Sequence, residues 1–374
     1  MKFDVSSTAL LSRLQSISKV IASKNSLPIL ECFLFRLGGN KLVITASDQE
    51  TRLETSVEVT NTDGDGLFAI SSKRLLEPLK ELPEQPLSFS INEENMEILI
   101  HFQNGKYNFI GERGDTYPQQ KPLKDDAIAL SIDSQILLSG ISRALFATAE
   151  DELRPVMNGI YFDIHQEDLT FVSSDGHKLV RLRNLSIQSA ERAAFILPKK
   201  PANLLKAILG KETDPVRINF DENNAVVSCK SFEMVCRLIE GRYPNYNSVI
   251  PVDNPYKATI DRQSLLNALK RVSAFADQST SLIKLQLKKN ELTVSAQDID
   301  YSTSAEEKLV CQFDGEDLNI GFKATFLIEI LGNIYSEEIV LELADPSRAG
   351  LILPAENSEN EELLMLLMPM MLND

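Results

Sequence analysis

Three stretches of this 374-residue chain repeat one pattern at a regular spacing, and this repetition constrains the fold more than any short motif does. Each copy has an apolar helix-like segment, then a strand, a turn and a second strand that ends in aspartate. The paired leucines of the helical segments lie 127 and 128 residues apart, and the strand-end aspartates lie 127 and 123 residues apart. These markers are Leu10–Leu11, Leu137–Leu138 and Leu265–Leu266, with Asp48, Asp175 and Asp298.

Each copy continues with a short apolar strand, a second helix beginning near Ser71, Pro198 or Lys323, and further strands with alternating apolar positions. We therefore predict an α+β protein of three tandem domains, each made of two helix-plus-sheet modules. The predicted domains span residues 1–124, 125–252 and 253–374, and a hydrophobic content of 43% is enough to give each domain its own core. The alternative is an ordinary α+β protein with coincidental spacing.

The four cysteines and the lack of long apolar segments indicate the cellular compartment. Cys32, Cys229, Cys236 and Cys311 show no metal-ligand spacing and are expected to be reduced thiols. The first residues have no apolar run of signal-peptide length, and no segment reaches the roughly 18 apolar residues of a membrane span. We therefore expect a cytoplasmic protein that does not associate with membranes.

Charge is unevenly distributed along the chain. A net charge of −16 argues by itself against nucleic acid, because lysine and arginine drive binding to phosphates. The net charges of the six predicted helices nevertheless sum to +11, which leaves a net charge of −27 for the rest of the chain. This distribution favours a basic surface that contacts a polyanion, such as a nucleic acid duplex that the protein surrounds. The alternative is that lysine and arginine are simply solvated, helix-favouring residues. The predicted helices cover residues 6–25, 71–82, 134–149, 198–211, 261–276 and 321–335.

The sequence offers no reaction to catalyse. His101, His165 and His177 lie on separate predicted strands or turns, which disfavours a histidine-rich metal site. No phosphate-binding loop, dinucleotide-binding glycine motif or nucleophile elbow occurs. We expect no catalytic residues, no metal and no cofactor. Two alternatives stay open: a scaffold that never touches DNA, and a hydrolase with an unrecognised carboxylate pair in a deep pocket.

Two segments are candidates for a recognition site. In Ser173–Leu179 the repeated aspartate is followed by Gly-His-Lys, and the alternative interpretation is a plain hairpin turn with glycine at positive φ. Leu363–Leu372 is an apolar run with four methionines, whose adaptable thioethers suit a groove for several peptides. The alternative there is a buried last strand, although Pro369 predicts that the chain leaves the sheet after Met368.

Several motifs along the chain, in order, resemble the beta-subunit family of bacterial DNA polymerase III, the replicative sliding clamps. They are Met1-Lys-Phe, Leu27-Pro-Ile-Leu30, Ser174-Asp-Gly-His-Lys-Leu179, Gly241-Arg-Tyr-Pro-Asn-Tyr246 and Leu367-Met-Pro-Met370. The resemblance implies a non-catalytic processivity factor made of three DNA-clamp domains. It also implies a head-to-tail homodimer that closes into a ring, with helices lining a pore for double-stranded DNA of any sequence.

The resemblance further implies which residues bind partners. A hydrophobic pocket between the second and third domains would take peptides from the clamp loader, the polymerase alpha subunit, other polymerases, ligase and mismatch-repair proteins. By position its residues are Met157, Ser174, Gly176, His177, Lys178, Leu179, Pro244, Val249, Ser347, Ala349, Leu366, Leu367, Met368, Pro369 and Met370. DNA contacts would fall on Lys24, Lys80, Lys199, Lys200, Arg13, Lys73, Arg74, Arg154, Lys206 and Arg271. The dimer interface would join Tyr107 and Phe109 to Ala274 and Phe275 of a second copy.

The chain departs from the family pattern in places. Ser248 and Met371 stand where basic residues are often found, which affects peptide preference, and Pro155-Val156 replaces an aromatic pair near a DNA-contacting turn. Pro78 falls inside the second predicted helix, where it should kink or end that helix.

Overall fold

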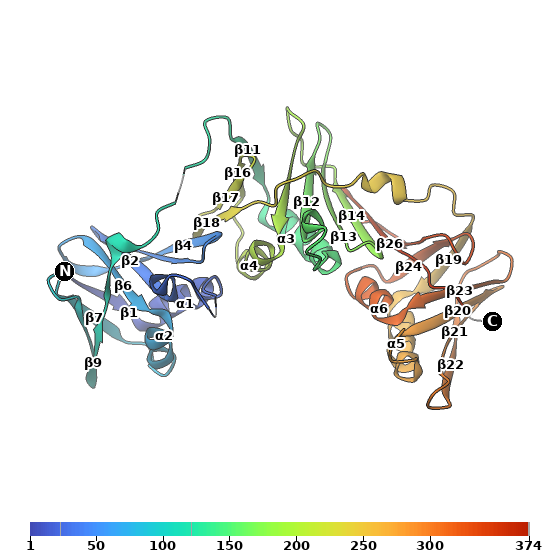
Figure 1. Cartoon of the computed structure of the whole chain (residues 1–374), viewed down its shortest axis with the longest axis horizontal. Coiled ribbons are helices and arrows are strands. Elements are labelled where there is room, and N and C mark those ends of the chain that lie inside the picture. Colours follow the sequence, from blue (N-terminus) through green and yellow to red (C-terminus); the bar gives the residue numbers. More distant parts are fainter. Residues whose placement is uncertain (23, 121, 373–374) are drawn as a thin grey trace. The chain divides into compact units, whose positions relative to one another are not determined.

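A computed structural model describes residues 1–22, 24–120 and 122–372, which form two compact units (Figure 1). Unit 1 contains Met1–Leu137 and Asn203–Leu238, and unit 2 contains Leu138–Ala202 and Ile239–Asp374. Each unit combines strands from two successive repeats, because these strands pair within a single sheet. The boundaries expected at residues 124 and 252 therefore stay predictions.

Unit 1 holds two antiparallel sheets. The first has the order β5-β1-β7-β8-β9. Its strands are β1 Lys2–Ser6, β5 Thr60–Asp63, β7 Pro86–Ile91, β8 Glu97–Phe102 and β9 Gly105–Ile110. The second has the order β10-β6-β2-β3-β4-β18-β17-β16-β11. Its strands are β2 Cys32–Gly38, β3 Lys41–Ser47, β4 Thr51–Glu58, β6 Gly66–Ser71, β10 Glu112–Arg113, β11 Ile128–Ile132, β16 Val216–Phe220, β17 Asn224–Ser228 and β18 Phe232–Arg237.

Unit 2 repeats this plan with an eight-stranded and a four-stranded antiparallel sheet. The larger has the order β15-β12-β13-β14-β26-β25-β24-β19. Its strands are β12 Gly159–Ile164, β13 Leu169–Ser174, β14 Lys178–Asn184, β15 Ala193–Pro198, β19 Tyr256–Asp261, β24 Glu338–Leu343, β25 Gly350–Pro354 and β26 Glu361–Leu367. The smaller has the order β22-β21-β20-β23. Its strands are β20 Leu282–Lys288, β21 Glu291–Asp298, β22 Thr303–Val310 and β23 Leu318–Lys323.

All six predicted helices are present, and each is shorter than predicted. They are α1 Ser7–Ser18, α2 Ser72–Lys80, α3 Ser134–Ala144, α4 Lys199–Leu209, α5 Arg262–Val272 and α6 Ala324–Gly332. One-turn 3₁₀ segments, η3 Leu145–Ala147 and η6 Ser273–Phe275, follow α3 and α5 and account for part of the difference.

The prediction that the first helix reaches residue 25 is wrong at its C-terminal end. Lys19 caps α1, and Lys24 lies beyond the helix. The hydroxyl groups of Ser16 and Ser18 donate to the carbonyls of Arg13 and Gln15, at 2.7 and 3.1 Å. Such local bonds compete with the helical hydrogen bonds and favour an end at this point.

Pro78 lies within α2, and the shortened helix expected from the sequence is confirmed. Proline has no N–H to donate to the carbonyl four residues earlier, so α2 loses a hydrogen bond near its end. The helix ends two residues later, at Lys80, and the Glu81 N–H donates to the Pro78 carbonyl at 3.2 Å in a tighter turn.

Pairs of helices pack across two sheets in each unit. Figure 1 shows α1 beside α2, and α5 beside α6. Helix α1 contacts β1 of one sheet and β3 and β4 of the other, burying Leu10, Leu14 and Ile17 at helical spacing. Helix α5 likewise contacts β19 of one sheet and β21 and β22 of the other. This equivalence is the structural form of the sequence repeat.

Candidate functional site

The antiparallel pair β14 and β26 carries most of the candidate recognition residues. Seven residue pairs join the two strands, from Lys178 with Leu367 to Asn184 with Glu361. Because side chains alternate along a strand, Leu179, Leu364 and Leu366 share one face of the sheet. We call this the Leu179 face. Lys178 and Leu367 point to the opposite face, toward the helices.

The Leu179 face is covered by a continuous hydrophobic cluster. Residues from three parts of unit 2 pack together there and are buried: Val172, Leu179, Ile196, Tyr243, Tyr246, Ala349, Leu351, Leu364 and Leu366. Two exposed apolar side chains lie next to it along the chain. Val249, 56% exposed, precedes Ile250, which packs against the cluster, and Met368, 42% exposed, follows the end of β26. The structure thus brings Leu179, Ala349 and Leu366 into one buried cluster, with exposed apolar side chains next to it along the chain.

The Gly-His-Lys segment is a hairpin turn between β13 and β14. The Asp175 carboxylate accepts the backbone N–H groups of His177 and Lys178, each at 2.9 Å. Gly176 has a φ of +92°, a conformation that side chains disfavour. The alternative of a hairpin with glycine at positive φ is therefore confirmed. The His177 ring lies 6.0 Å from the Phe326 ring of α6.

Lys178 is held on the helix side of the sheet. Its Nζ lies 2.7 Å from Glu329 Oε2 and 3.3 Å from Asp175 Oδ2, and 4.3 Å from the centre of the Phe326 ring. The residue is buried, so its side chain contributes to packing between β14 and α6. Only its backbone can reach the Leu179 face, and the same holds for Leu367.

The C-terminal segment crosses the end of this region. The Met368 N–H donates to the His177 carbonyl and the Met370 N–H to the Gly321 carbonyl, both at 2.8 Å. A Cβ at Gly321 would lie 2.7 Å from the Met370 oxygen, so the tail packs directly on the backbone of β23. The buried last strand is confirmed for β26, and so is the exit from the sheet after it.

The remaining predicted pocket residues lie on surrounding loops. Met157 is buried in η4, Pro155–Met157, and its carbonyl accepts the Ala149 N–H at 2.9 Å. Ser347 belongs to a turn in which its N–H and hydroxyl donate to Asp345, at 2.9 and 2.5 Å. Pro244 precedes η5, Tyr246–Val249.

A tyrosine network that the sequence reading left unassigned fixes this loop. The rings of Tyr161 and Tyr243 stack at 4.7 Å, and the Tyr246 hydroxyl donates to Asp163 Oδ2 at 2.9 Å. Burial raises the pKa of both Tyr243 and Tyr246, which keeps the phenols protonated. The network holds Tyr243 and Tyr246, and with them the intervening Pro244, against the Leu179 face. Its only signal in the sequence is the Arg-Tyr-Pro-Asn-Tyr motif.

The candidate DNA-binding residues are distributed over helices and turns. Lys73, Arg74 and Lys80 are exposed on α2, and Lys206 is exposed on α4, which also carries Lys199 and Lys200. Arg13 lies on α1 and is partly buried. Some of these cations have carboxylate partners: Lys199 pairs with Glu150, and Arg271 of α5 makes a bidentate pair with Glu307 at 2.8 and 2.6 Å.

Arg154 lies apart from the helices. Its Nε donates to Asp151 Oδ2 at 2.8 Å and its Nη2 to the Asp175 carbonyl at 3.5 Å. It therefore packs against the Gly176 turn, within reach of the candidate peptide site.

The predicted interface residues lie at sheet edges. Tyr107 and Phe109 are on β9, which pairs only with β8 among the described strands. Ala274 and Phe275 are exposed in η6, which packs beside β22, and β22 pairs only with β21 among the described strands. Both edges thus present unpaired backbone groups.

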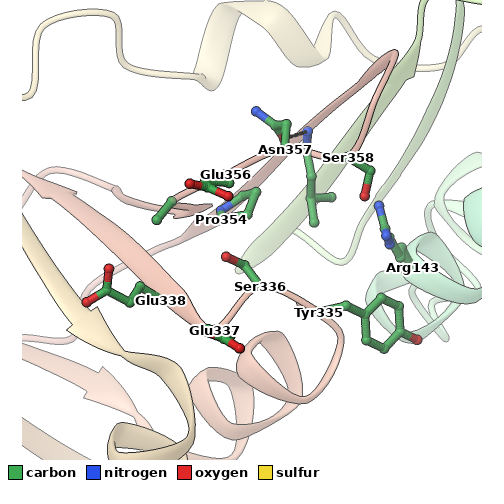
Figure 2. A pocket seen from close by; sticks show the side chains of 11 residues that line it. Arg143, Tyr335, Ser336, Glu337, Glu338, Pro354, Glu356, Asn357 and Ser358 are labelled. Carbon is green, nitrogen blue, oxygen red and sulfur yellow. Dashed lines mark hydrogen bonds between the residues drawn. The ribbon is translucent and has the colours of Figure 1, made fainter.

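Acidic residues also gather away from the Gly176 turn. A hollow of about 390 Å³ has Arg143 and Tyr335 on one side and Glu338 and Glu356 on the other (Figure 2). Arg143 is paired with Glu361 at 2.6 Å, and its guanidinium lies 5.2 Å from the centre of the Tyr335 ring. This is the kind of pocket that the hydrolase alternative would need.

A second acidic group lies on unit 2. Asp277, Asp298 and Asp300 bring carboxylate oxygens within 4.8 Å of one another. Asp277 already accepts bonds from Ser279 and Thr280, at 2.6 and 2.8 Å. Hydrogen bonding to the side chains of Ser279 and Thr280 lowers the pKa of Asp277.

The repeated helix-and-sheet modules, with basic helices in an acidic chain, define a protein of the DNA-clamp class. Three family models match in chain order: the N-terminal domain of the DNA polymerase III beta subunit at residues 1–120, the central domain at 131–245 and the C-terminal domain at 247–371. The chain belongs to this family, the bacterial beta sliding clamps. It is accordingly a non-catalytic processivity factor, which excludes the hydrolase alternative.

Similar proteins match along their whole length. The beta sliding clamp of Haemophilus influenzae is 25% identical over 372 residues, covering 100% of both chains. That of Pseudomonas putida is 26% identical and covers 98% of this chain and 99% of its own. A crystal structure of the Pseudomonas aeruginosa clamp bound to griselimycin has a TM-score of 0.94 at 25% identity, and the Thermotoga maritima beta subunit has 0.90 at 26%, each covering 100% of both chains.

None of the helices in the described part of the chain is long and apolar enough to cross a membrane.

Proposed function

We propose that two copies of this chain join head to tail into a closed ring around duplex DNA, and that the Leu179 face tethers partner proteins to it. The observation that carries the proposal is the exposure of Lys73, Arg74, Lys80 and Lys206 on helices of a chain with a net charge of −16. A basic surface retained in an acidic protein favours contact with a polyanion.

The DNA contacts would be directed at phosphates. A ring that slides cannot hold one sequence, and lysine and arginine contacts to the backbone carry no sequence information. The residues we assign to this role are Lys24, Lys80, Lys199, Lys200, Arg13, Lys73, Arg74, Lys206 and Arg271. The Glu150 and Glu307 partners of Lys199 and Arg271 would exchange with phosphates. Arg154 has its place beside the Gly176 turn and would act on DNA or on a partner from there.

The open sheet edges support the homodimer. Exposed edge strands invite pairing, and proteins normally cover or blunt them. Strand β9 carries Lys106 and ends at Ile110, which is 75% exposed, whereas β22 carries Glu306 and ends at Val310, which is 87% exposed. Pairing β9 of one copy with β22 of another would cover both apolar ends and bring opposite charges together. Phe275 would lie at the border of this interface.

The peptide site would serve several partners in turn. The exposed rim at Val249 and Met368, next to a buried apolar cluster, suits short peptides with hydrophobic side chains. We assign the clamp loader, the polymerase alpha subunit, other polymerases, ligase and mismatch-repair proteins to this site. Because Ser248 and Met371 stand where basic residues are often found in the family, the surroundings of this site would carry less positive charge than the family pattern. The assembly would act in the cytoplasm, where the chromosome is replicated.

Topological retention tests the ring. The protein is incubated with primed circular DNA, the matching clamp loader and ATP, and its retention is measured before and after the circle is linearised. We expect retention on the circle and loss from the linear form. Equal retention on both would mean ordinary DNA binding without encirclement, and no retention on either form would favour the scaffold alternative.

The variant Lys199→Glu with Lys200→Glu tests the DNA-facing surface. It should impair loading and processive synthesis while the dimer stays intact in sedimentation. A collapse to monomer would show instead that these lysines belong to the interface.

A further inference from the structure

A polar hollow of about 650 Å³ lies on unit 2 beside the Leu179 face, away from the residues assigned above. Its side chains come from β13, β14, the turn between β12 and β13, η5 and the segment that precedes β15. Arg181 and Arg183 of β14 point into it, because they share the Leu179 face at the next two alternating positions. Among the other lining residues are Asp168, Thr170, Tyr246 and Asn247.

The two arginines differ in their partners. Arg183 Nη2 lies 2.7 Å from Asp168 Oδ2, and its Nη1 lies 2.6 Å from Glu362 Oε2. These contacts raise the pKa of Arg183, with the Asp168 hydrogen bond as the main cause. The positive charge of Arg183 is therefore balanced by the carboxylates of Asp168 and Glu362.

Arg181 has no such carboxylate. Among the described residues its hydrogen-bond acceptor is the Asn247 side-chain oxygen, at a long 3.4 Å, and no acidic group lies within 4.0 Å. Its Nε is buried without a hydrogen-bond partner. Burial, with the neighbouring Arg183 charge, lowers the pKa of Arg181. A half-buried cation without a carboxylate partner destabilises the protein, unless a bound ligand supplies the missing negative charge.

We propose that Arg181 binds a carboxylate of the partner peptide, an aspartate or glutamate that follows or precedes the residues in the hydrophobic site. The inference rests on the proposed peptide-binding function and deepens it. A planar guanidinium can match a carboxylate with two parallel hydrogen bonds. The neighbouring Arg183 shows that acidic groups are accommodated here, since it donates one hydrogen bond to Asp168 and one to Glu362.

The charges around the hollow favour a single carboxylate over a phosphate. Glu167 and Asp168 line it, and the buried Asp163 lies behind it, hydrogen-bonded to Tyr246. Three acidic groups would repel a dianion more strongly than a monoanion. Arg192, whose side chain is 73% exposed, adds a cation at the rim, and its Nη2 is 3.9 Å from Asp163 Oδ1.

A peptide can reach both places. Two residues along a strand span about 7 Å, so Arg181 follows Leu179 within the length of a few peptide residues. The segment that carries Pro244 and Val249 also carries Tyr246 and Asn247, which border the hollow. One loop therefore borders both the apolar site and the unpaired arginine.

The test is a double-mutant cycle on the intact protein. The probe is a fluorescein-labelled peptide from the matching polymerase alpha subunit, chosen as the shortest fragment that binds. Each of its aspartates and glutamates is replaced in turn by asparagine or glutamine. Affinities are measured by anisotropy for the unmodified protein, for Arg181→Gln and for Val249→Asp. Arg217→Gln, an exposed arginine on β16 of unit 1, is the matched control.

Arg181→Gln should weaken binding of one acidic peptide about tenfold and change binding of its amide counterpart less than twofold. Arg217→Gln should change neither affinity. The inference is overturned if Arg181→Gln affects acidic and amide peptides equally, or affects neither while Val249→Asp abolishes binding; in both cases the apolar site stands alone. If no alpha-subunit fragment binds, or Val249→Asp changes nothing, the proposed peptide site itself fails. Inorganic phosphate and free glutamate are also added at millimolar concentration as competitors of the labelled peptide. If phosphate competes as strongly as glutamate, Arg181 is not specific for a carboxylate.

Discussion

Two strand pairs join successive repeats of this clamp, and they differ in what their exposed faces carry. In unit 1, β18 of the central domain pairs with β4 of the N-terminal domain through five residue pairs. In unit 2, β14 of the central domain pairs with β26 of the C-terminal domain through seven. We refer to them as the first and second junctions.

The first junction is apolar on one face only. Leu53 opposite Met234 is buried there, whereas Glu54 stands opposite Glu233 on the other face. The second junction has buried apolar pairs on both faces: Val180 and Met365 toward the helices, and Leu179 and Leu366 on the face away from them. The proposed partner site thus lies at the junction that has a buried apolar pair on its second face as well.

The largest expected effect comes from the ion pair that supports the second junction. Arg143 and Glu361 are about nine-tenths buried, and Ser139 also donates to Glu361 at 3.1 Å. Arg143→Met should lower the free energy of unfolding by about 3–5 kcal/mol, because Glu361 is left buried without a cation. Urea denaturation measures this.

The first junction supplies the comparison for that variant. Arg52→Met removes a more exposed pair with Glu54 at 3.5 Å and should cost only about 0–1 kcal/mol. Arg143→Met with Glu361→Leu should recover most of the loss. Equal losses at the two junctions would show that burial of the pair does not distinguish them.

An intermediate effect is expected where the tail crosses β23. Gly321→Val would put side-chain atoms where the Met370 carbonyl and Leu372 now lie, and should displace the tail. We expect partner-peptide affinity to fall about tenfold or more, since a factor of ten corresponds to only 1.4 kcal/mol. Isothermal titration with the alpha-subunit peptide measures it.

Gly332→Ala is the matched control, because an added Cβ there meets nothing within 4 Å. It should leave peptide affinity unchanged. If Gly321→Val bound the peptide normally, the C-terminal tail would not be part of the peptide-binding site.

The smallest effect is expected on the polar face of the first junction. Glu233 and Glu54 are directly opposite in an antiparallel pair, where like charges repel. Glu233→Gln should therefore stabilise unit 1 by about 0.2–0.5 kcal/mol, seen as a higher urea midpoint with an unchanged denaturant slope. The gain should shrink at high salt. Destabilisation would mean that Glu233 makes a favourable contact in the assembled protein.

Local signals in the sequence predicted the helices well and their ends less well. Leucine and isoleucine at helical spacing place α1 and α5, since such a stripe must be buried whatever it packs against. The end of α1 at Ser18 depends on serine hydroxyls that donate hydrogen bonds to backbone carbonyls three residues earlier. The spacing of apolar residues carries no information about such bonds. The end of α2 was predictable, in contrast, because the missing N–H of Pro78 acts within the helix itself and shortens it.

The candidate site was predictable in its composition and only partly in its geometry. The Gly-His-Lys turn and the methionine-rich end meet where the Met368 N–H donates to the His177 carbonyl. Alternation along β14 nevertheless separates Lys178 from Leu179 and Leu367 from Leu366, and it turns Arg181 toward the polar hollow. The pairing register, which depends on residues nearly 190 positions apart, decides these directions.

By itself, the sequence determined the threefold repeat, the helix-and-strand content and the acidic chain with basic helices, because periodicity and charge are properties of neighbouring residues. Only the tertiary structure decided that strands of successive repeats share one sheet, that the tyrosine network holds the 243–249 loop against the Leu179 face, and that Arg181 is left without a carboxylate. Each of these depends on which distant segments meet, and burial and pairing across long separations set that outcome.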